Sequence, residues 1–206
     1  YDSFIFSKMT SRRTFYRFVK RTMDIFGGLL MFMFGLPFMI LAVLALKVES
    51  FRDPIFYTQE RLTKDDRIFK VIKFRSMVVN AEDETGAVLA GKHDSRVTRV
   101  GHILRKFRID EIPQCINIIK GDMSLVGPRP ERPEFVEQFK EELPLYAYRH
   151  RVRSGLSGLA QISGFYSTPA ADKLKHDLYY VEQHSIILDL KIMLLTLEVI
   201  LTPSKA

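Results

Sequence analysis

Residues 25–46, IFGGLLMFMFGLPFMILAVLAL, decide the fold class because none of these 22 residues carries a charge. As one helix the block measures about 33 Å, enough to cross a hydrocarbon core of about 30 Å. A buried helix of a soluble core is disfavoured, because every face of the block is apolar. A secretory signal peptide is disfavoured too, since the block begins well inside the chain and lacks a small-residue cleavage site. We therefore expect a membrane segment.

The flanks of this block and the proline within it favour a particular path through the membrane. Basic residues stand on both sides, so neither flank is marked for translocation. They are Lys8, Arg12, Arg13, Arg17, Lys20 and Arg21 before the block and Lys47, Arg52, Arg61, Lys64, Arg67 and Lys70 after it. Pro37, near the midpoint, removes a backbone hydrogen bond and kinks a helix. A re-entrant, proline-broken helix hairpin satisfies both observations, and a spanning helix with a tolerated proline is the alternative.

The composition of the 206 residues excludes several classes of protein. Hydrophobic residues make up 47% of the chain and charged residues 27%, which excludes a disordered tail. The single cysteine, Cys115, excludes an intrachain disulfide and is expected to be a small buried hydrophobic residue. The five histidines show no zinc spacing. The net charge of +7 is compatible with nucleic-acid binding. Basic residues on both sides of an apolar block, however, favour binding of anionic lipid headgroups and phosphate substrates.

Hydrophobic periodicity predicts a mainly helical α+β protein. Two short strands, 55–59 and 68–75, with turn residues between them, predict a β-hairpin. Helices are expected over four further segments, namely 97–107, from about 110 onward, 134–150 and 171–182. Loops are expected at 79–95, 121–134 and 155–170. We divide the chain into residues 1–50, a basic segment with the membrane helix, and residues 51–206, a catalytic domain.

The last apolar segment predicts a second contact with the membrane. Residues 186–201 are strongly apolar but short for a membrane span, which is typical of an amphipathic helix at the interface.

Two adjacent carboxylates, Asp110 and Glu111, are the sharpest local signal for chemistry. If a helix begins here, Asp110 is its N-cap, beside free backbone N–H groups and the positive end of the helix dipole. Pro113 then lies in the first turn, where proline is tolerated. The structural alternative is a cap with ion pairs from Asp110 to Lys106 and from Glu111 to Arg108.

Two further stretches suit a phosphate ligand. Arg129 lies in Gly127-Pro128-Arg129-Pro130, where restricted backbone dihedral angles would aim its side chain, and a planar guanidinium binds phosphate bidentately. The glycine-rich residues 153–164 (RSGLSGLAQISG) would let the backbone approach a ligand. Each stretch by itself is also compatible with a purely structural role.

Taken together, these motifs resemble the bacterial sugar transferase family, the monotopic polyprenyl-phosphate phosphoglycosyl transferases. The matching pieces are FYTQER (56–61), FKVIKFRSM (69–77), LRKFRIDEIPQCINIIKGDMSLVGPRPERPEF (104–135), the glycine stretch, DLYYV (177–181) and LDLKIMLLTL (188–197). Family members often have Arg-Pro-Gly and Gly-Trp-Ala-Gln where this chain has Arg153-Ser154-Gly155 and Gly158-Leu159-Ala160-Gln161. The start at Tyr1 resembles the catalytic portion of the longer members, and we expect further sequence ahead of it.

The resemblance implies a reaction at the cytoplasmic face of the bacterial inner membrane. A phospho-sugar passes from a UDP-sugar to polyprenyl (undecaprenyl) phosphate with release of UMP, as the first membrane step of surface polysaccharide assembly. Asp110 is implied to form a covalent phospho-sugar intermediate, with Glu111 as its partner. Mg²⁺ is the implied cofactor, with Asp110 and Glu111 as its ligands. The alternative role of Glu111 is to accept a proton from the incoming lipid phosphate.

The implied phosphate- and substrate-binding residues are mostly basic, as a diphosphate requires. They are Arg105, Arg129, Arg75, Lys73, Arg153, Gln161 and Asp177, and for Gln161 and Asp177 a structural contact is the alternative. The expected partners are the UDP-sugar, polyprenyl phosphate and membrane lipids, without nucleic acid, and a homo-oligomer stays open. The alternatives are a direct Mg²⁺-assisted transfer without a covalent intermediate and an inactive membrane scaffold for glycan assembly.

Overall fold

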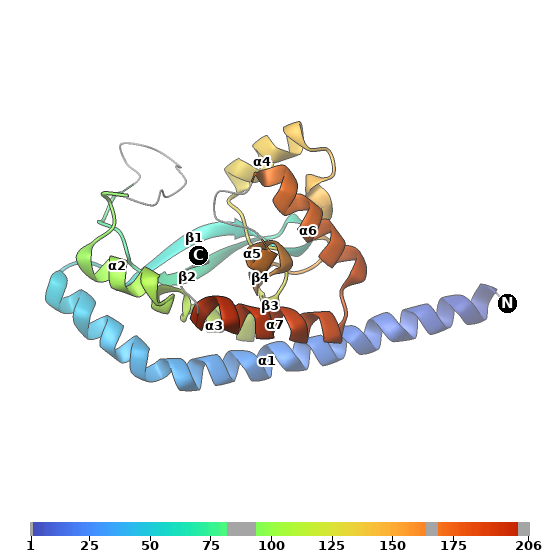
Figure 1. Ribbon diagram of the computed structural model, residues 1–206, viewed down its shortest axis with the longest axis horizontal. Coiled ribbons are helices and arrows are strands. Elements are labelled where there is room, and N and C mark those ends of the chain that lie inside the picture. Colours follow the sequence, from blue (N-terminus) through green and yellow to red (C-terminus); the bar gives the residue numbers. More distant parts are fainter. Residues whose placement is uncertain (1, 82–93, 164–168, 202–206) are drawn as a thin grey trace.

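The computed structural model describes residues 2–81, 94–163 and 169–201. One long helix, α1 (Asp2–Glu49), runs along one edge of the molecule, and the other elements lie on one side of it (Figure 1). The fold is mostly helical with a small β-hairpin, as the sequence predicts.

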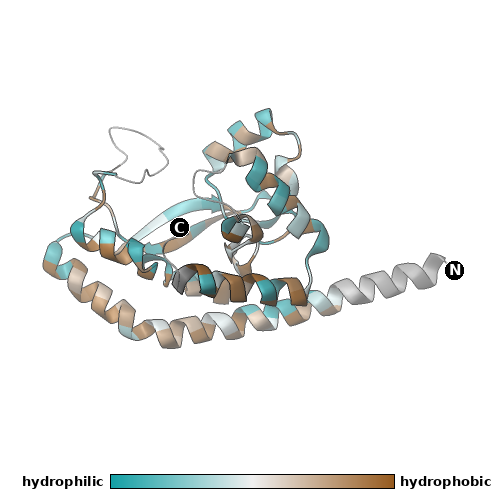
Figure 2. Ribbon diagram, viewed as in Figure 1, coloured by the Kyte–Doolittle hydropathy of each residue, from teal (hydrophilic) through white to brown (hydrophobic). Residues whose placement is uncertain are grey.

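Helix α1 contains the apolar block and exposes most of it. Over Thr14–Glu49 it is long and apolar enough to cross a membrane, the one helix among the described residues that is, and only 17% of its most apolar window is buried. Figure 2 shows these apolar residues as the mostly brown C-terminal half of the helix. The sequence predicts a helix broken at Pro37, but α1 stays continuous and instead bends in the half that contains Pro37 (Figure 1). A proline removes only one helical hydrogen bond, so a bend without a break satisfies the backbone.

The predicted β-hairpin is confirmed. Strands β1 (Phe56–Leu62) and β2 (Ile68–Phe74) pair antiparallel from Phe56↔Phe74 to Leu62↔Ile68, joined by the turn η1 (Lys64–Asp66). One face of the hairpin packs on α3 (Gln114–Lys120). The Asn117 side chain fixes this contact, since its amide oxygen accepts from Ile72 N at 3.0 Å and its amide nitrogen donates to Lys70 O at 2.9 Å. Lys73, at the end of β2, is thereby held close to the residues that precede α3.

Three of the predicted helices occur near their predicted positions and a fourth is shorter. They are α2 (Arg99–Lys106), α6 (Ala170–Gln183), α7 (Ile186–Leu201) and α4 (Pro133–Glu142). The helix predicted over 134–150 ends at Glu142 and is followed by the 3₁₀ segment η3 (Tyr146–Arg151). Most of the loop predicted over 79–95 lies outside the described residues.

Two stretches predicted as loops contain short elements instead. Strand β3 (Ser124–Val126) pairs in parallel with β4 (Gly155–Ser157), which is followed by α5 (Leu159–Ser163). Glycine permits this pairing, because a Cβ atom on Gly155 would lie 2.1 Å from the backbone nitrogen of Gly127. A glycine-rich stretch read as a loop therefore brings residues 153–158 against the segment that carries Arg129.

Helix α1 packs closely on the core of the domain. A Cβ atom on Gly28 would lie 2.9 Å from Ile119 Cγ1, and one on Gly35 would lie 2.6 Å from Ile112 Cγ2. Further along, Ala42 and Leu46 join a buried cluster with Phe74 and Leu104. Cys115, also at this interface, is fully buried, as predicted. The apolar helix thus contacts the segment that follows Asp110 and Glu111 directly.

Candidate active site

Asp110 and Glu111 lie in η2 (Ile109–Glu111), a 3₁₀ turn between α2 and α3. The prediction that Asp110 caps a helix is wrong, because α3 begins only at Gln114. The backbone around Pro113 has 3₁₀ hydrogen bonds instead, from Ile112 N to Ile109 O at 3.2 Å and from Cys115 N to Ile112 O at 3.0 Å. Arg108, with φ 53° and ψ 24°, turns the chain sharply after α2 and places the two carboxylates in the turn.

Glu111 is the acceptor for several cations. Its Oε1 lies 2.9 Å from Lys73 Nζ and 3.6 Å from Arg129 Nη2, and its Oε2 lies 3.9 Å from Arg108 Nη1. The predicted pair with Arg108 is therefore present. Burial opposes ionisation of Glu111, but the charges of Lys73 and then Arg129 outweigh it and hold the pKa of Glu111 well below its usual range.

Asp110 has the opposite environment, although it is the adjacent residue. It is buried, and within the described residues it forms no ion pair, so the predicted pair with Lys106 is absent. Burial and then the negative charge of Glu111 raise the pKa of Asp110 to about 6, against the opposing charges of Lys73 and Arg105. The turn therefore presents one firmly ionised carboxylate beside one poorly solvated, more basic carboxylate.

A small cavity opens next to this turn and carries excess positive charge. Its lining comprises Arg61, Val71, Lys73, Glu111, Gln114, Arg129, Pro130, Gly155 and Leu156. Three cations and one carboxylate thus line the cavity, and Arg61 has a second carboxylate, Glu131, at 3.6 Å. Such a surplus of basic side chains suits a phosphate or diphosphate. Arg61 and Gln114 are not among the residues predicted for the site. The available signal was their place inside two of the quoted motifs, FYTQER and the long run from residue 104.

The segment that aims Arg129 into this cavity is held by hydrogen bonds along its length. The backbone carbonyl groups of four successive residues, 128–131, accept hydrogen bonds from three elements, β4, η3 and β1, and these bonds hold the segment in place. The bonds run to Pro128 O from Gly155 N (2.9 Å), to Arg129 O from Arg149 Nη2 (2.9 Å), to Pro130 O from Arg61 Nη1 (3.2 Å) and to Glu131 O from Leu62 N (3.0 Å).

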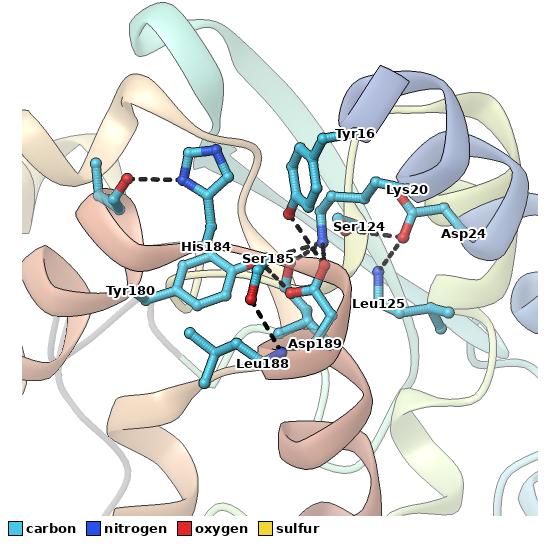
Figure 3. Close-up of polar contacts among 12 residues, drawn as sticks. Tyr16, Lys20, Asp24, Ser124, Leu125, Tyr180, His184, Ser185, Leu188 and Asp189 are labelled. Atoms are coloured by element: carbon cyan, nitrogen blue, oxygen red, sulfur yellow. Dashed lines mark hydrogen bonds and ion pairs between the residues drawn. The ribbon is translucent and has the colours of Figure 1, made fainter. Parts of the chain in front are cut away.

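The beginning of the same segment is held by the N-terminal half of α1. Lys20 Nζ donates to Val126 O at 3.1 Å, to Tyr180 Oη at 3.1 Å and to Asp189 Oδ2 at 2.8 Å (Figure 3). Asp189 also accepts from Tyr16 at 3.0 Å and from Tyr180 at 2.7 Å. We call Tyr16, Lys20, Tyr180 and Asp189 the anchor cluster. It joins α1, α6 and α7 at the strand that leads to Arg129.

Two neighbours of Lys20 on α1 extend this attachment. Asp24 Oδ1 accepts from Ser124 Oγ at 2.8 Å and from Leu125 N at 2.9 Å (Figure 3). Arg21 donates to two carbonyl groups at the end of α3, Ile118 O at 2.7 Å and Ile119 O at 2.6 Å. Lys20 and Arg21, predicted as charges that flank the membrane, are therefore engaged inside the protein.

The structure brings some of the predicted binding residues to Asp110 and Glu111 but not others. Lys73 and Arg129 line the cavity. Arg105 does not line it but donates to Ser76 Oγ at 2.9 Å, and its charge acts against the raised pKa of Asp110. Arg75 instead pairs with Asp53 at 3.0 Å and lines a separate cavity with Thr98 and Arg99.

The remaining three predicted residues do not line the cavity. Arg153 is exposed, and Gln161 donates to Leu156 O at 3.0 Å. Asp177 is buried and forms an ion pair with Arg149 at 2.7 Å. Because Arg149 donates to Arg129 O, Asp177 is connected to the cavity only through the segment that carries Arg129.

The carboxylates suit a metal only in part. Among the described residues no cluster of three or more His, Cys, Asp or Glu side chains surrounds this turn. Mg²⁺, however, is commonly held by one or two carboxylates, with phosphate oxygens and water completing its shell. Asp110 and Glu111 fit a Mg²⁺ that arrives with a diphosphate, and do not form an all-protein cage.

Comparison with known proteins identifies one family and several related bacterial proteins. The family described as bacterial sugar transferase matches residues 15–203. A UDP-N-acetylgalactosamine-undecaprenyl-phosphate N-acetylgalactosaminephosphotransferase of Aeromonas hydrophila is 46% identical over 91% of this chain and 44% of its own length. A UDP-glucose:undecaprenyl-phosphate glucose-1-phosphate transferase of Caulobacter vibrioides is 38% identical over 91% of this chain and 71% of its own. An exopolysaccharide production protein of Rhizobium leguminosarum bv. phaseoli is 36% identical over 91% and 97%. The chain thus spans less than half of the first relative and nearly all of the last.

Proposed function

Because the chain belongs to the bacterial sugar transferase family, we propose that it transfers a sugar phosphate from a UDP-sugar to undecaprenyl phosphate and releases UMP. The observation that carries this proposal is the cavity in which Arg61, Lys73 and Arg129 face Glu111, directly beside Asp110. Donor and acceptor are both phosphate anions, so a site for either needs surplus positive charge. The relatives from Aeromonas and Caulobacter are named for undecaprenyl phosphate as acceptor.

In the first proposed step, a carboxylate oxygen of Asp110 attacks the phosphorus that bears the sugar. A new bond forms between this oxygen and the phosphorus, and the bond from the phosphorus to the bridging oxygen of the diphosphate breaks. UMP leaves with the bridging oxygen and its electron pair, and Asp110 carries the phospho-sugar as an acyl phosphate. Burial suits Asp110 to this role, because a poorly solvated carboxylate with a raised pKa is the better nucleophile.

In the second step, a phosphate oxygen of the lipid attacks the same phosphorus. The bond to Asp110 breaks, the free carboxylate returns, and the lipid becomes a diphosphate linked to the sugar. Lys73 and Arg129 are placed to bind the phosphate oxygens in both steps, and Arg105 offsets the charge of Asp110. Mg²⁺ bound with the diphosphate would neutralise part of its negative charge.

The proposal is tested by release of UMP from a panel of UDP-sugars. UDP-N-acetylgalactosamine, UDP-glucose and UDP-galactose are offered to the full chain in lipid nanodiscs, with and without undecaprenyl phosphate. Asp110→Asn should lower UMP release by at least about 10³-fold. Asp172→Asn, on α6, changes a half-exposed carboxylate that pairs with Lys175 and does not line the cavity, and it should leave UMP release unchanged. Normal turnover of Asp110→Asn would show that Asp110 is not the nucleophile.

The covalent step has a separate readout. Without lipid acceptor, UDP-sugar should release one UMP per protein and leave an adduct on residues 104–120 that mass spectrometry detects. Strict dependence of UMP release on the lipid, with no adduct, would favour direct transfer instead.

We further propose that α1 is re-entrant and that the active site faces the cytoplasm. The support is that both halves of α1 pack on the same domain, Lys20 through Asp189 and Leu46 through Phe74. A straight crossing would separate these two halves by the bilayer. Arg17→Cys and Phe51→Cys, both at exposed positions, should resist an impermeant maleimide in intact spheroplasts and react after permeabilisation. Labelling of Phe51→Cys in intact spheroplasts would contradict the re-entrant path.

A further inference from the structure

Glu111 uses the cations that a diphosphate would need. Lys73 Nζ and Arg129 Nη2 both approach the same oxygen of Glu111, Oε1, at 2.9 and 3.6 Å. Both basic side chains also line the cavity and keep part of their surface accessible, 21% for Lys73 and 41% for Arg129. The pairs with Glu111 are therefore within reach of a ligand that enters the cavity, unlike pairs enclosed in a core.

A physical reason for these pairs follows from the charges around them. Arg61, Lys73 and Arg129 line one small cavity, and Arg61 already pairs with Glu131 at 3.6 Å. Lys73 and Arg129 would be costly to hold in a partly buried place without a carboxylate between them. The carboxylate of Glu111 offsets this cost. Carboxylate and phosphate oxygens also accept charge-assisted hydrogen bonds from lysine and arginine in the same way.

We propose that Glu111 occupies, in the ligand-free protein, the place of a substrate phosphate, and that the diphosphate of the nucleotide displaces it from Lys73 and Arg129. This inference rests on the proposed function and adds a role for Glu111 before the reaction begins. Glu111 stabilises the empty site, and its displacement lowers the affinity for the nucleotide. Once displaced, the carboxylate lies beside Asp110 without Lys73, free for a different partner during the reaction.

The adjacent carboxylate provides a matched control. Asp110 and Glu111 carry the same charge, but Glu111 lines the cavity and pairs with Lys73, whereas Asp110 is buried and forms no ion pair among the described residues. Neutralising either residue removes one negative charge from the same turn. Only neutralising Glu111 removes the charged oxygen that Lys73 and Arg129 both contact.

The test is binding of UDP to the full chain in nanodiscs, with EDTA present so that no divalent metal contributes. Glu111→Gln should bind UDP about tenfold more tightly than the unmodified protein, the equivalent of one strong charged contact. Asp110→Asn should change the affinity for UDP by about threefold or less, because it removes a negative charge that acts on UDP only at long range. Equal tightening by both variants, no tightening by Glu111→Gln, or no UDP binding by any of the proteins would overturn the inference.

A second variant separates occupancy from net charge and does not depend on Glu111→Gln folding. Glu111→Asp keeps the charge but shortens the side chain by one methylene group, which withdraws the carboxylate from Lys73. It should also bind UDP more tightly, by about threefold, whereas an effect of net charge alone predicts no change. Weaker binding by Glu111→Asp contradicts displacement.

Failure of this inference is distinguishable from failure of the proposed function. If the unmodified protein releases UMP from a UDP-sugar but Glu111→Gln and Glu111→Asp do not bind UDP more tightly, only the displacement of Glu111 is wrong. If the unmodified protein releases UMP from no UDP-sugar, the proposed function itself is wrong.

Discussion

Two lysine–carboxylate pairs in this protein have nearly equal lengths and very different surroundings. Lys20 and Asp189 are 2.8 Å apart in the anchor cluster, and Lys73 and Glu111 are 2.9 Å apart in the cavity. Asp189 is 2% exposed and has one cation with two tyrosine hydroxyl groups around it. Glu111 is 14% exposed and faces three cations. In the first pair one cation balances one carboxylate, whereas in the second the carboxylate has more than one cation around it.

The difference indicates what each pair does. In the anchor cluster every charge has its counterpart, so a further anion would find nothing to bind, and the pair serves to join α1 to α7 and β3. At the cavity Arg61 has Glu131 as its partner, but Glu111 faces Lys73, Arg108 and Arg129 and does not neutralise all three, so an incoming anion can compete for them. Distance and residue type alone do not separate a structural ion pair from a ligand site, whereas the local sum of charges does.

The largest expected effect is the loss of turnover in Lys73→Met, and its absence would break the comparison. If Lys73 binds phosphate oxygens, its loss should lower kcat/KM for the UDP-sugar by about 10²- to 10³-fold. Glu111 keeps Arg129 and Arg108 as neighbours, so the free energy of unfolding should fall by only about 1 kcal/mol. UMP release and the melting temperature in nanodiscs measure the two quantities.

Lys70→Met is the matched control for this prediction. Lys70 lies on the same strand, β2, but is exposed and does not line the cavity. Its loss should change neither quantity. If Lys73→Met were to keep turnover within twofold of the unmodified protein and yet melt many degrees lower, Lys73 would be a structural residue like Lys20, and the comparison would collapse.

The elements with strong periodic signals could be predicted from the sequence. The apolar block, the hairpin and residues 186–201 each show a pattern that one local structure satisfies, and the structure has them close to the predicted positions. The short strands β3 and β4 could not be predicted. Their pairing depends on Gly127 and Gly155 meeting across about thirty residues of sequence, and glycines in a local window indicate only a loop.

The central residues of the candidate site could be predicted from the sequence, but which further charged residues line the cavity could not. Asp110, Glu111, Lys73 and Arg129 were identified from motifs, and the structure places them together. The motif that contains Asp177 is compatible with a nucleotide contact and with a structural one, and the structure has the structural one, an ion pair with the buried Arg149 that no spacing connects to it. Burial and long-range pairing decide whether a charged side chain faces a ligand or the protein, and neither is visible in local sequence.

Lys20→Met should have a smaller effect on turnover than Lys73→Met and a larger effect on stability, which would sharpen the comparison between the two pairs. Removing Lys20 leaves the buried Asp189 with only the hydroxyl groups of Tyr16 and Tyr180, and an uncompensated buried carboxylate destabilises by about 3 kcal/mol. For a chain of this size the melting temperature should fall by about 6–12 °C. Below the melting transition kcat/KM should change by less than about fivefold, because Lys20 contacts Val126 rather than the cavity. Lys191→Met, at an exposed position on α7, is the control and should melt within about 2 °C of the unmodified protein. A loss of turnover as large as that of Lys73→Met, without a lower melting temperature, would mean that the anchor cluster belongs to the catalytic machinery.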